Sequence, residues 1–303
     1  MLKFKIINQF LLISFLIIFC PNCGRRRERI VKKVDLRQKR INDVKIDELK
    51  ADNQINEQKV TIWVHGTCLF PRLFLNKSFN SDPGLTKAQS VTPNYYLKTI
   101  AESISVGAPM DYPFEAFYIF GWSGGMNNRE RKEAAKNLYL SIIEIFECYK
   151  LQNKIPKITI ITHSHGGNVA LNLAKLNKNN NNVFIEKLIM LACPVQNKTK
   201  ENVKNPFFKK IYSFYSTMDF LQVLDPQGFH KKKNCQKKSS LFSQRCFDYC
   251  TNLKQIQIKL NDRGILHSEF LTVNFLKILP DIIAEIDSST NSSSEFLLNI
   301  HMS

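Results

Sequence analysis

The sequence predicts an α/β fold in which helices cover both faces of a mostly parallel sheet. Two observations predict this class: strand-length apolar runs recur along the chain, and segments of helical periodicity separate them. The runs are nearly continuous in apolar residues, which is typical of strands buried on both faces. Right-handed crossovers between parallel strands place ligand chemistry at the carboxyl ends of the strands.

Six segments are expected to form the sheet. The first, from Lys59 to Val64 (KVTIWV), ends at His65-Gly66, and the third, from Lys157 to Ile161 (KITII), ends at Thr162. The other four expected strands are Ala116 to Phe120, Leu188 to Ala192, Lys210 to Tyr215 and Gln255 to Leu260. Most of these segments end at a turn-forming or polar residue, as strands that lead into catalytic loops do.

Helical spacing predicts two helices between these strands. Apolar residues at 138, 142, 145 and 149 lie on one helix face, and Asn127 or Asn128 is suited to cap the start of that helix. The second helix follows Gly167 and is expected to bury Val169, Leu173 and Leu176. Strand and helix therefore alternate through the middle of the chain, as in a doubly wound sheet.

A single domain over residues 58–286 is expected, and it closes with a helix. This helix runs from about Ser268 to Ile286, and Pro280 is expected to kink or divide it. A charge-rich segment at 24–57 reads as a partly helical tether before the domain, and a Ser-rich tail at 287–303 follows it.

Residues 1–23 have the layout of a secretory signal or an N-terminal membrane anchor. Lys3 and Lys5 precede an apolar run that ends at Cys20, and this run is shorter than the roughly 20 residues of a membrane-spanning helix. Cys20 and Cys23 resemble the lipid-attachment cysteine of bacterial lipoproteins. The arginines after Cys23 are instead typical of an uncleaved anchor, whose positive charges stay at one membrane face. We expect the protein to be exported or membrane-attached.

Composition narrows the class of partner. The chain has 303 residues, 44% of them hydrophobic, which excludes a disordered or collagen-like protein. Lys and Arg number 43 against 26 Asp and Glu, for a formal net charge of +17. This charge favours anionic partners, with an anionic membrane surface as the candidate. The segment 228–240, with five lysines, is interpreted first as a solvated loop and second as a site that docks on anionic lipid. Nucleic acid is not favoured, because no aromatic interleaving or known binding module accompanies the charge.

Two serines compete for the role of nucleophile. Ser123 lies in Gly121-Trp-Ser-Gly-Gly, a literal match to the pattern Gly-x-Ser-x-Gly. Ser164 lies in Thr162-His-Ser-His-Gly, where threonine replaces the first glycine, but a strand leads into it and a helix leaves it at once. That strand-turn-helix context exposes a serine at the apex of a sharp turn. We therefore prefer Ser164, with Ser123 as the alternative in a Gly-rich loop where Trp122 packs.

The motifs WVHGT at 63–67 and ITHSHGGNVAL at 161–171, with a late acid and a late histidine, resemble the α/β-hydrolase superfamily. The sequence is most similar to its lipase- and serine-esterase-like members, over about 210 residues. The resemblance implies a serine, an acid and a histidine in that chain order, and a central parallel sheet with helices on both faces.

The resemblance also implies which residues act as the base, the acid and the oxyanion donors. His267 comes after the strand QIQIKL and before the closing helix, where the superfamily carries its base. Asp219 follows the strand KIYSFY and matches the family's acid, with Asp225 as the alternative. The backbone N–H groups of His165 and Thr67 are the expected oxyanion donors. His163 is expected to point away from the apex of the turn.

The implied reaction is hydrolysis of a carboxylic ester or lipid through an acyl-enzyme, which requires no metal and no organic cofactor. The alternative is a catalytically silent protein of the same fold that binds lipid or a partner at the membrane. Three cysteines at 235, 246 and 250 match no closed zinc pattern, and a disulfide among them is expected in an exported protein.

Overall fold

The structure is a computed structural model that describes residues 56–67, 83–92, 96–177, 183–224, 243–289 and 294–300, and the backbone of 30–34. Its strands are β1 (Ile30–Val34), β2 (Glu57–Val64), β3 (Gly84–Lys87), β4 (Phe117–Gly121), β5 (Ile155–His163), β6 (Ile185–Leu191), β7 (Phe208–Tyr215), β8 (Leu253–Leu260), β9 (Arg263–Gly264) and β10 (Glu295–Ile300). Its α-helices are α2 (Tyr96–Gly107), α3 (Asn128–Leu151), α4 (Gly166–Asn172), α5 (Leu221–Leu224) and α6 (Val273–Ser288). Short 3₁₀ turns include η7 (Leu173–Lys175) and η9 (His267–Leu271).

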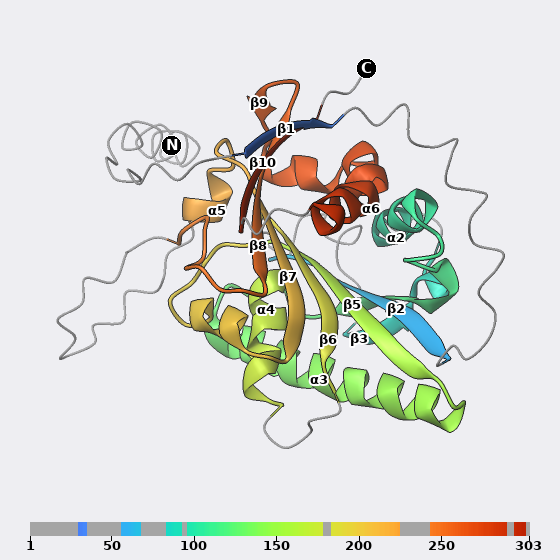
Figure 1. Ribbon diagram of the computed structural model, residues 1–303. Coiled ribbons are helices and arrows are strands. Elements are labelled where there is room, and N and C mark those ends of the chain that lie inside the picture. The colour runs from blue at the N-terminus through green and yellow to red at the C-terminus, as the bar shows by residue number, and fades with distance from the viewer. Residues whose placement is uncertain are drawn as a thin grey trace, which may run out of the picture.

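One sheet organises the described part of the chain, in the order β1-β10-β8-β7-β6-β5-β2-β4-β3, with β9 paired to β8. All neighbours along this order are parallel except β3 and β4, and the β8–β9 pair is also antiparallel. Helices α3 and α4 cover one face of the sheet, and α2 and α6 pack against each other on the other face (Figure 1). The expected fold class, an α/β-hydrolase sheet with helices on both faces, is confirmed.

Two apolar cores lie on the two faces of the sheet. On the α3 and α4 face, Leu138 and Ile142 pack with the inward side chains of β2, β5 and β6. On the opposite face, α2 and α6 pack against alternate residues of the same strands, such as Trp63. Side chains on both sides of the central strands are buried, which explains why those strands are apolar at nearly every position.

All six expected strands are present, and their ends matter most at β5. This strand continues two residues past the expected end, to His163, so that Ser164 follows the strand directly. The first expected helix is α3, and Asn127 caps it by accepting a hydrogen bond from the Glu130 backbone N–H at 2.9 Å. The second helix is short: α4 ends at Asn172 and continues as η7.

The closing helix differs from expectation in one respect. The sequence placed its start at about Ser268, whereas the structure has η9 there and begins α6 at Val273, capped by Thr272. Pro280 does not divide the helix, which runs on to Ser288. Helix α2 was not among the expected helices, although its buried Leu97, Ile100 and Ile104 have helical spacing.

The sheet also extends beyond the expected domain of 58–286. Strand β10 lies in the segment expected to be a tail, and it pairs in parallel with β8 from Glu295 to Ile300. Strand β1 lies in the segment expected to be a tether, and it pairs with β10. Phe296, Leu298 and Ile300 are buried at alternate positions, which is the period of a strand. Because a serine run precedes these residues, the sequence indicated a tail there. The predicted end of the domain at residue 286 was therefore wrong.

Within the described residues, no helix has the length and apolar character needed to cross a membrane. The expected signal or anchor at 1–23, with Cys20 and Cys23, lies outside the described residues. Most of the expected tether at 24–57, the alternative acid Asp225, the lysine-rich segment 228–240 and Cys235 also lie outside them.

Candidate active site

A sharp turn between β5 and α4 presents Ser164. Its φ of 52° is in the left-handed region, which costs a non-glycine residue about 1–3 kcal/mol. Two backbone hydrogen bonds hold this conformation: the Ser164 N–H donates to the Leu191 carbonyl at 2.8 Å, and the Gly167 N–H donates to the Ser164 carbonyl at 3.1 Å. The turn therefore carries backbone strain that its surroundings stabilise, as an exposed-apex nucleophile requires.

The residues around the turn fit closely against neighbouring strands. A Cβ on Gly166 would lie 2.4 Å from the Val64 carbonyl oxygen, so this position has no room for a side chain. Thr162 stands where the common pattern has glycine, and it is fully buried with its hydroxyl donating to the Ile189 carbonyl at 3.4 Å. The departure from the pattern is accommodated because the threonine points toward the neighbouring strand β6.

Asp219 and His267 meet at the carboxyl ends of the strands. The His267 Nδ1 and the Asp219 Oδ2 are 2.8 Å apart, and Asp219 is 1% exposed. The other carboxylate oxygen accepts a hydrogen bond from the Gln222 backbone N–H at 3.0 Å. Arg245 holds the turn that carries the acid, because its guanidinium donates to the carbonyls of Ser216, Thr217 and Asp219. The structure thus brings the two expected residues together, 48 positions apart in sequence.

His163, which precedes Ser164, contacts the expected base. The rings of His163 and His267 are 4.6 Å apart, and the His163 Nε2 lies 3.1 Å from the His267 carbonyl oxygen. Burial, reinforced by the neighbouring His267, lowers the pKa of His163 to about 3, so its ring is neutral and Nε2 carries the donating proton. The His163 side chain makes its hydrogen bond and its ring contact with His267, and neither involves the Ser164 hydroxyl. Its contact joins the serine turn to the loop of His267.

The loop after β2 lies against the serine turn. A Cβ on Gly66 would be 2.9 Å from the Ser164 Cβ, so the backbone of Gly66 and the serine are neighbours. His65 fixes this loop: its Nδ1–H donates to the Gly66 carbonyl at 2.8 Å, while its Nε2 accepts from the Trp122 backbone N–H at 3.3 Å. Burial lowers the pKa of His65 to about 4, which keeps the ring neutral for these two roles. These two hydrogen bonds of His65 fix the shape of the loop.

Ser123 lies in a different environment. Its hydroxyl is exposed and donates to the Glu130 carboxylate at 2.8 Å, so it belongs to the polar cluster that begins α3. Trp122 is buried, stacks on His65 and donates from Nε1 to the His65 carbonyl at 2.9 Å. The tryptophan therefore packs beside the loop, as expected, and the serine after it faces away toward the helix.

A buried cation lies beneath the serine turn, and the sequence did not indicate it. Arg131 of α3 is 4% exposed, and its guanidinium contacts the ring of His165, the residue after Ser164. Asn168 approaches the same ring, with its Nδ2 3.3 Å from Nδ1 of His165, and donates to the Pro194 carbonyl at 2.9 Å. The available signal was positional: Arg131 shares the helix face of Ala135 and Leu138, which is otherwise apolar.

The other candidate acids and cysteines of the late part of the chain lie apart from Ser164, Asp219 and His267 or outside the described residues. Asp248, a further acid between Cys246 and Cys250, is exposed and faces Lys200 at 3.9 Å. Cys246 and Cys250 form no disulfide with each other, which removes one of the expected pairings. Over the described ranges, no three His, Cys, Asp or Glu side chains are grouped in a way that could hold a metal ion.

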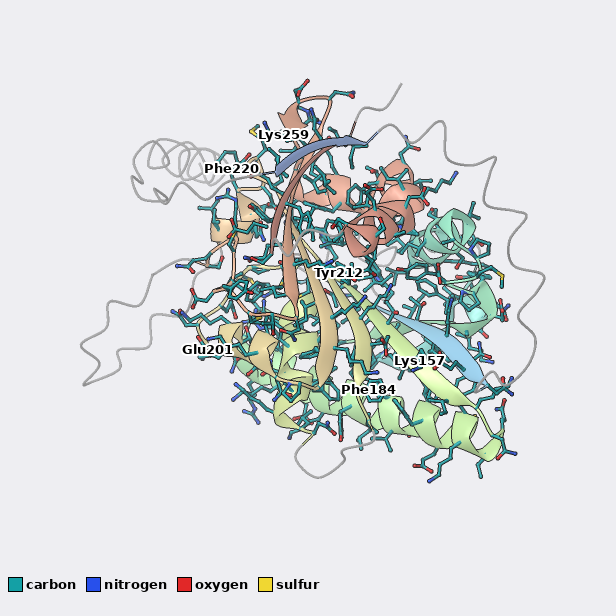
Figure 2. All side chains as sticks on the ribbon, in the orientation of Figure 1. Lys157, Phe184, Glu201, Tyr212, Phe220 and Lys259 are labelled. Carbon is teal, nitrogen blue, oxygen red and sulfur yellow. The ribbon has the colours of Figure 1, made fainter. Side chains whose placement is uncertain are left out.

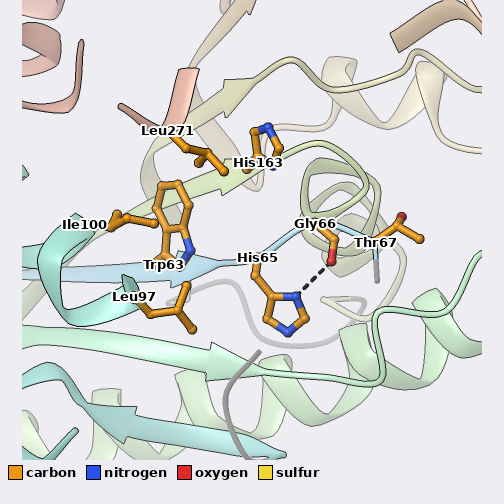
Figure 3. Close-up of a pocket in the computed structure, with 8 residues that line it drawn as sticks. All are labelled: Trp63, His65, Gly66, Thr67, Leu97, Ile100, His163 and Leu271. Carbon is orange, nitrogen blue, oxygen red and sulfur yellow. Dashed lines mark hydrogen bonds between the residues drawn. The ribbon is translucent and has the colours of Figure 1, made fainter. Parts of the chain in front are cut away.

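A cavity of about 130 Å³ opens beside the serine turn. Figure 3 shows it between the end of β2 and the residues of α2 and η9. Its described lining residues are Trp63, His65, Gly66, Thr67, Leu97, Ile100, His163 and Leu271. The lining combines an apolar wall with the polar loop expected to hold the oxyanion.

One of three comparisons with known proteins gives a family match. Residues 124–244 match the model of a family described as "PGAP1-like alpha/beta domain", and this range includes Ser164 and Asp219. A comparison with curated protein sequences finds no match. A matching solved structure, "Phospholipase PlaB from Legionella pneumophila in complex with thio-NAD", is 18% identical, with a TM-score of 0.29. That match covers 45% of this chain and 25% of the phospholipase chain.

The sheet order, the strained serine turn after β5 and the family match point to one assignment. The described sheet has the α/β-hydrolase fold, and residues 124–244 are similar to the PGAP1-like alpha/beta domain family.

Proposed function

We propose that this protein is a serine hydrolase that cleaves carboxylic esters through Ser164, His267 and Asp219, with an acyl-enzyme intermediate. The observation that supports this most strongly is the 2.8 Å contact between His267 Nδ1 and a buried Asp219 carboxylate. The serine turn lies at the same end of the sheet, linked to the histidine loop by His163. A histidine held by a buried acid, at the same end of the sheet as a strained serine, supports nucleophilic acyl transfer.

The pairing with Asp219 assigns the protons of His267. Nδ1–H donates to the carboxylate, so Nε2 of the neutral ring carries the lone pair. That lone pair accepts the Ser164 Oγ proton as the oxygen attacks the ester carbon, and Asp219 stabilises the imidazolium that forms. The imidazolium then protonates the departing alcohol, and water, deprotonated by the same ring, releases the acid from the serine.

The developing oxyanion needs preorganised donors, and we assign the backbone N–H groups of Thr67 and His165 to this role. His165 is the residue before α4, so its N–H lies at the start of that helix. Thr67 follows Gly66, whose backbone is beside Ser164. Removal of one such donor typically raises the barrier by about 3 kcal/mol.

We further propose that the substrate is an ester or a lipid presented at a membrane. The formal charge of +17 supports attraction to an anionic surface, and the apolar segment at 6–20 supports export or membrane attachment.

The test is a set of three variants assayed on a short-chain ester: Ser164→Ala, His267→Ala and the double variant. Because nucleophile and base act as a unit, each single variant should lose about 10⁶-fold in kcat, and the double variant should lose little more. If the losses of the single variants multiply in the double variant, the two residues do not act together. If the full chain hydrolyses no ester at all, it is a catalytically silent member of the fold that binds lipid or a partner.

A further inference from the structure

Two residues that line the cavity beside Ser164 each carry a buried polar side-chain atom that lacks a hydrogen-bond partner among the described residues. These atoms are the indole Nε1 of Trp63 and the hydroxyl of Thr67. Trp63 is 1% exposed, so water at the surface cannot reach its N–H in the way it reaches a surface tryptophan. Buried donors are almost always paired in folded proteins, and an unpaired one calls for an explanation.

The other tryptophan of the chain shows the contrast. Trp122 is also buried, but its Nε1 donates to the His65 carbonyl at 2.9 Å. Trp63 approaches the same loop from the opposite side of the sheet, within the α2 and α6 core. In Figure 3 its nitrogen lies on the side that faces His65 and Gly66, away from Ile100. The free N–H is therefore directed toward the end of β2, where the reaction takes place.

The cavity has the size and lining of a site for a small organic group. Its volume of about 130 Å³ is close to the roughly 150 Å³ of an apolar cavity that admits benzene. It therefore accommodates about six non-hydrogen atoms. Leu97, Ile100 and Leu271 supply apolar contacts, and Trp63 and Thr67 supply the polar ones.

The position of the cavity relates it to the acyl half of an ester. Gly66 and Thr67 line it, and they belong to the loop assigned to the oxyanion. The oxyanion forms on the acyl carbon, so a cavity that shares this loop lies next to the acyl group of the bound ester. Leu271 closes it from η9, which begins at His267.

We infer that this cavity binds a short acyl group that carries an oxygen, and that this oxygen accepts a hydrogen bond from the Trp63 indole N–H. The inference rests on the proposed ester hydrolysis and specifies its substrate class: a hydroxy- or oxo-acyl ester with about six non-hydrogen atoms or fewer beyond the ester carbonyl. An acyl group without the oxygen leaves the Trp63 N–H unpaired when it displaces water, and it is therefore disfavoured.

The first experiment compares ethyl 3-hydroxybutanoate with ethyl butanoate as substrates of the full chain. The ratio of kcat/KM for the hydroxy ester to that for the plain ester should exceed ten. Trp63→Phe removes the N–H and keeps an aromatic ring, and it should reduce this ratio about tenfold, as the loss of one ordinary hydrogen bond does. Trp122→Phe is the matched control: it removes a paired N–H and should change both esters alike, leaving the ratio as it was.

The second experiment does not depend on turnover. The chain has two tryptophans, so ¹⁵N-labelled Ser164→Ala protein gives two indole N–H signals in an NMR spectrum, which Trp63→Phe assigns. Ethyl 3-hydroxybutanoate should move the Trp63 signal more than ethyl butanoate does, and the Trp122 signal should move with neither.

The outcomes separate the two proposals. If the esters are hydrolysed but the ratio is near one, or Trp63→Phe leaves it unchanged, the cavity holds only water and the inference is wrong while the hydrolase proposal stands. If no ester is hydrolysed but the Trp63 signal moves selectively with the hydroxy ester, the binding site stands and the hydrolase proposal fails. Equal movement with both esters contradicts the oxygen-specific site.

Discussion

Two serine loops lie on either side of β2, and only one has the geometry of a nucleophile. Strand β4 pairs with one edge of β2 and ends at the loop of Ser123, while β5 pairs with the other edge and ends at Ser164. Ser123 has the literal Gly-x-Ser-x-Gly sequence, and Ser164 does not. The chain turns through a φ of 52° at Ser164 and enters a helix two residues later, whereas α3 begins five residues after Ser123.

The backbone geometry of the turn, and not the literal motif, therefore distinguishes the proposed nucleophile from Ser123. Each serine has a carboxylate nearby, but the carboxylates serve different ends. Glu130 receives a hydrogen bond from Ser123 directly and helps to start α3, on the surface. Asp219 is buried and pairs with His267, the residue proposed as the base for Ser164. Equivalent substitutions in the two loops should therefore have different effects.

The largest difference is expected at the serines themselves. Ser164→Ala should reduce kcat on a short-chain ester by about 10⁶-fold, because it removes the attacking oxygen. Ser123→Ala should keep most of the activity, because its hydroxyl bonds the Glu130 carboxylate and the Gly125 N–H, within its own loop and the start of α3. Steady-state rates of both purified variants decide the comparison. Loss of activity in Ser123→Ala with retention in Ser164→Ala would reverse the assignment.

The two carboxylates should differ next. Asp219→Asn keeps the size of the side chain but disfavours the tautomer that His267 needs, and it should lower kcat about 10⁴-fold. Glu130→Gln, the matched change at the other loop, should leave kcat within severalfold, since Glu130 is half-buried and bonds Ser123 and the start of α3. A loss in Glu130→Gln as large as that in Asp219→Asn would show that the β4 loop takes part in the chemistry.

The glycines two residues after each serine should differ in stability. Gly166→Ala forces a Cβ to within 2.4 Å of the Val64 carbonyl oxygen and 2.7 Å of the His65 carbonyl oxygen, which cannot move independently of β2. We expect a loss of about 1–3 kcal/mol in the free energy of unfolding. Gly125→Ala meets only the flexible end of the Glu130 side chain and should cost less than about 1 kcal/mol. Urea denaturation of both variants measures this, and equal losses would contradict the packing account.

The residues before the serines should differ in pH dependence. His163 has a pKa of about 3 in the folded chain against 6.5 for an ordinary histidine, so between these values the unfolded chain binds the extra proton. Its contribution to stability is complete above pH 6.5 and declines, by up to about 1.4 kcal/mol per pH unit, as the pH falls toward 3. His163→Asn should reduce the slope of unfolding free energy against pH by that amount between pH 6 and 4.

The matched control, Trp122→Phe, replaces a side chain that does not titrate, so it should leave the slope of the parent protein unchanged. Denaturation midpoints at several pH values give all three slopes. Parallel slopes for the parent protein and His163→Asn would mean that His163 is not buried as a neutral ring.

Much of the fold could be predicted from the sequence because the central strands are apolar on both faces and α3 has a clear cap at Asn127. The edge of the sheet could not, because β10 follows a serine run and β1 lies among charged residues. A segment in which apolar and polar residues alternate, or which carries charge, indicates a buried strand less clearly than a continuously apolar segment does.

Within the site, Ser164, Asp219 and His267 could be selected because each follows a strand end in the required order. The supporting residues could not. His163 joins the two loops through a contact across 104 positions, and Arg131 is a buried cation on an amphipathic helix. Trp63 is one of several apolar residues in a core strand, and the role of its N–H depends on what remains unpaired around it. Such roles depend on tertiary contacts that local sequence does not encode.

Covalent labelling with a fluorophosphonate shows directly whether the turn after β5 holds the nucleophile. The probe reacts with an activated serine, and mass spectrometry of the digested protein locates the modified residue. We expect a single modified serine, Ser164. Labelling should be abolished in His267→Ala and preserved in Ser123→Ala. Labelling at Ser123, or labelling at Ser164 that persists undiminished without His267, would contradict the assignment of Ser164 as the nucleophile.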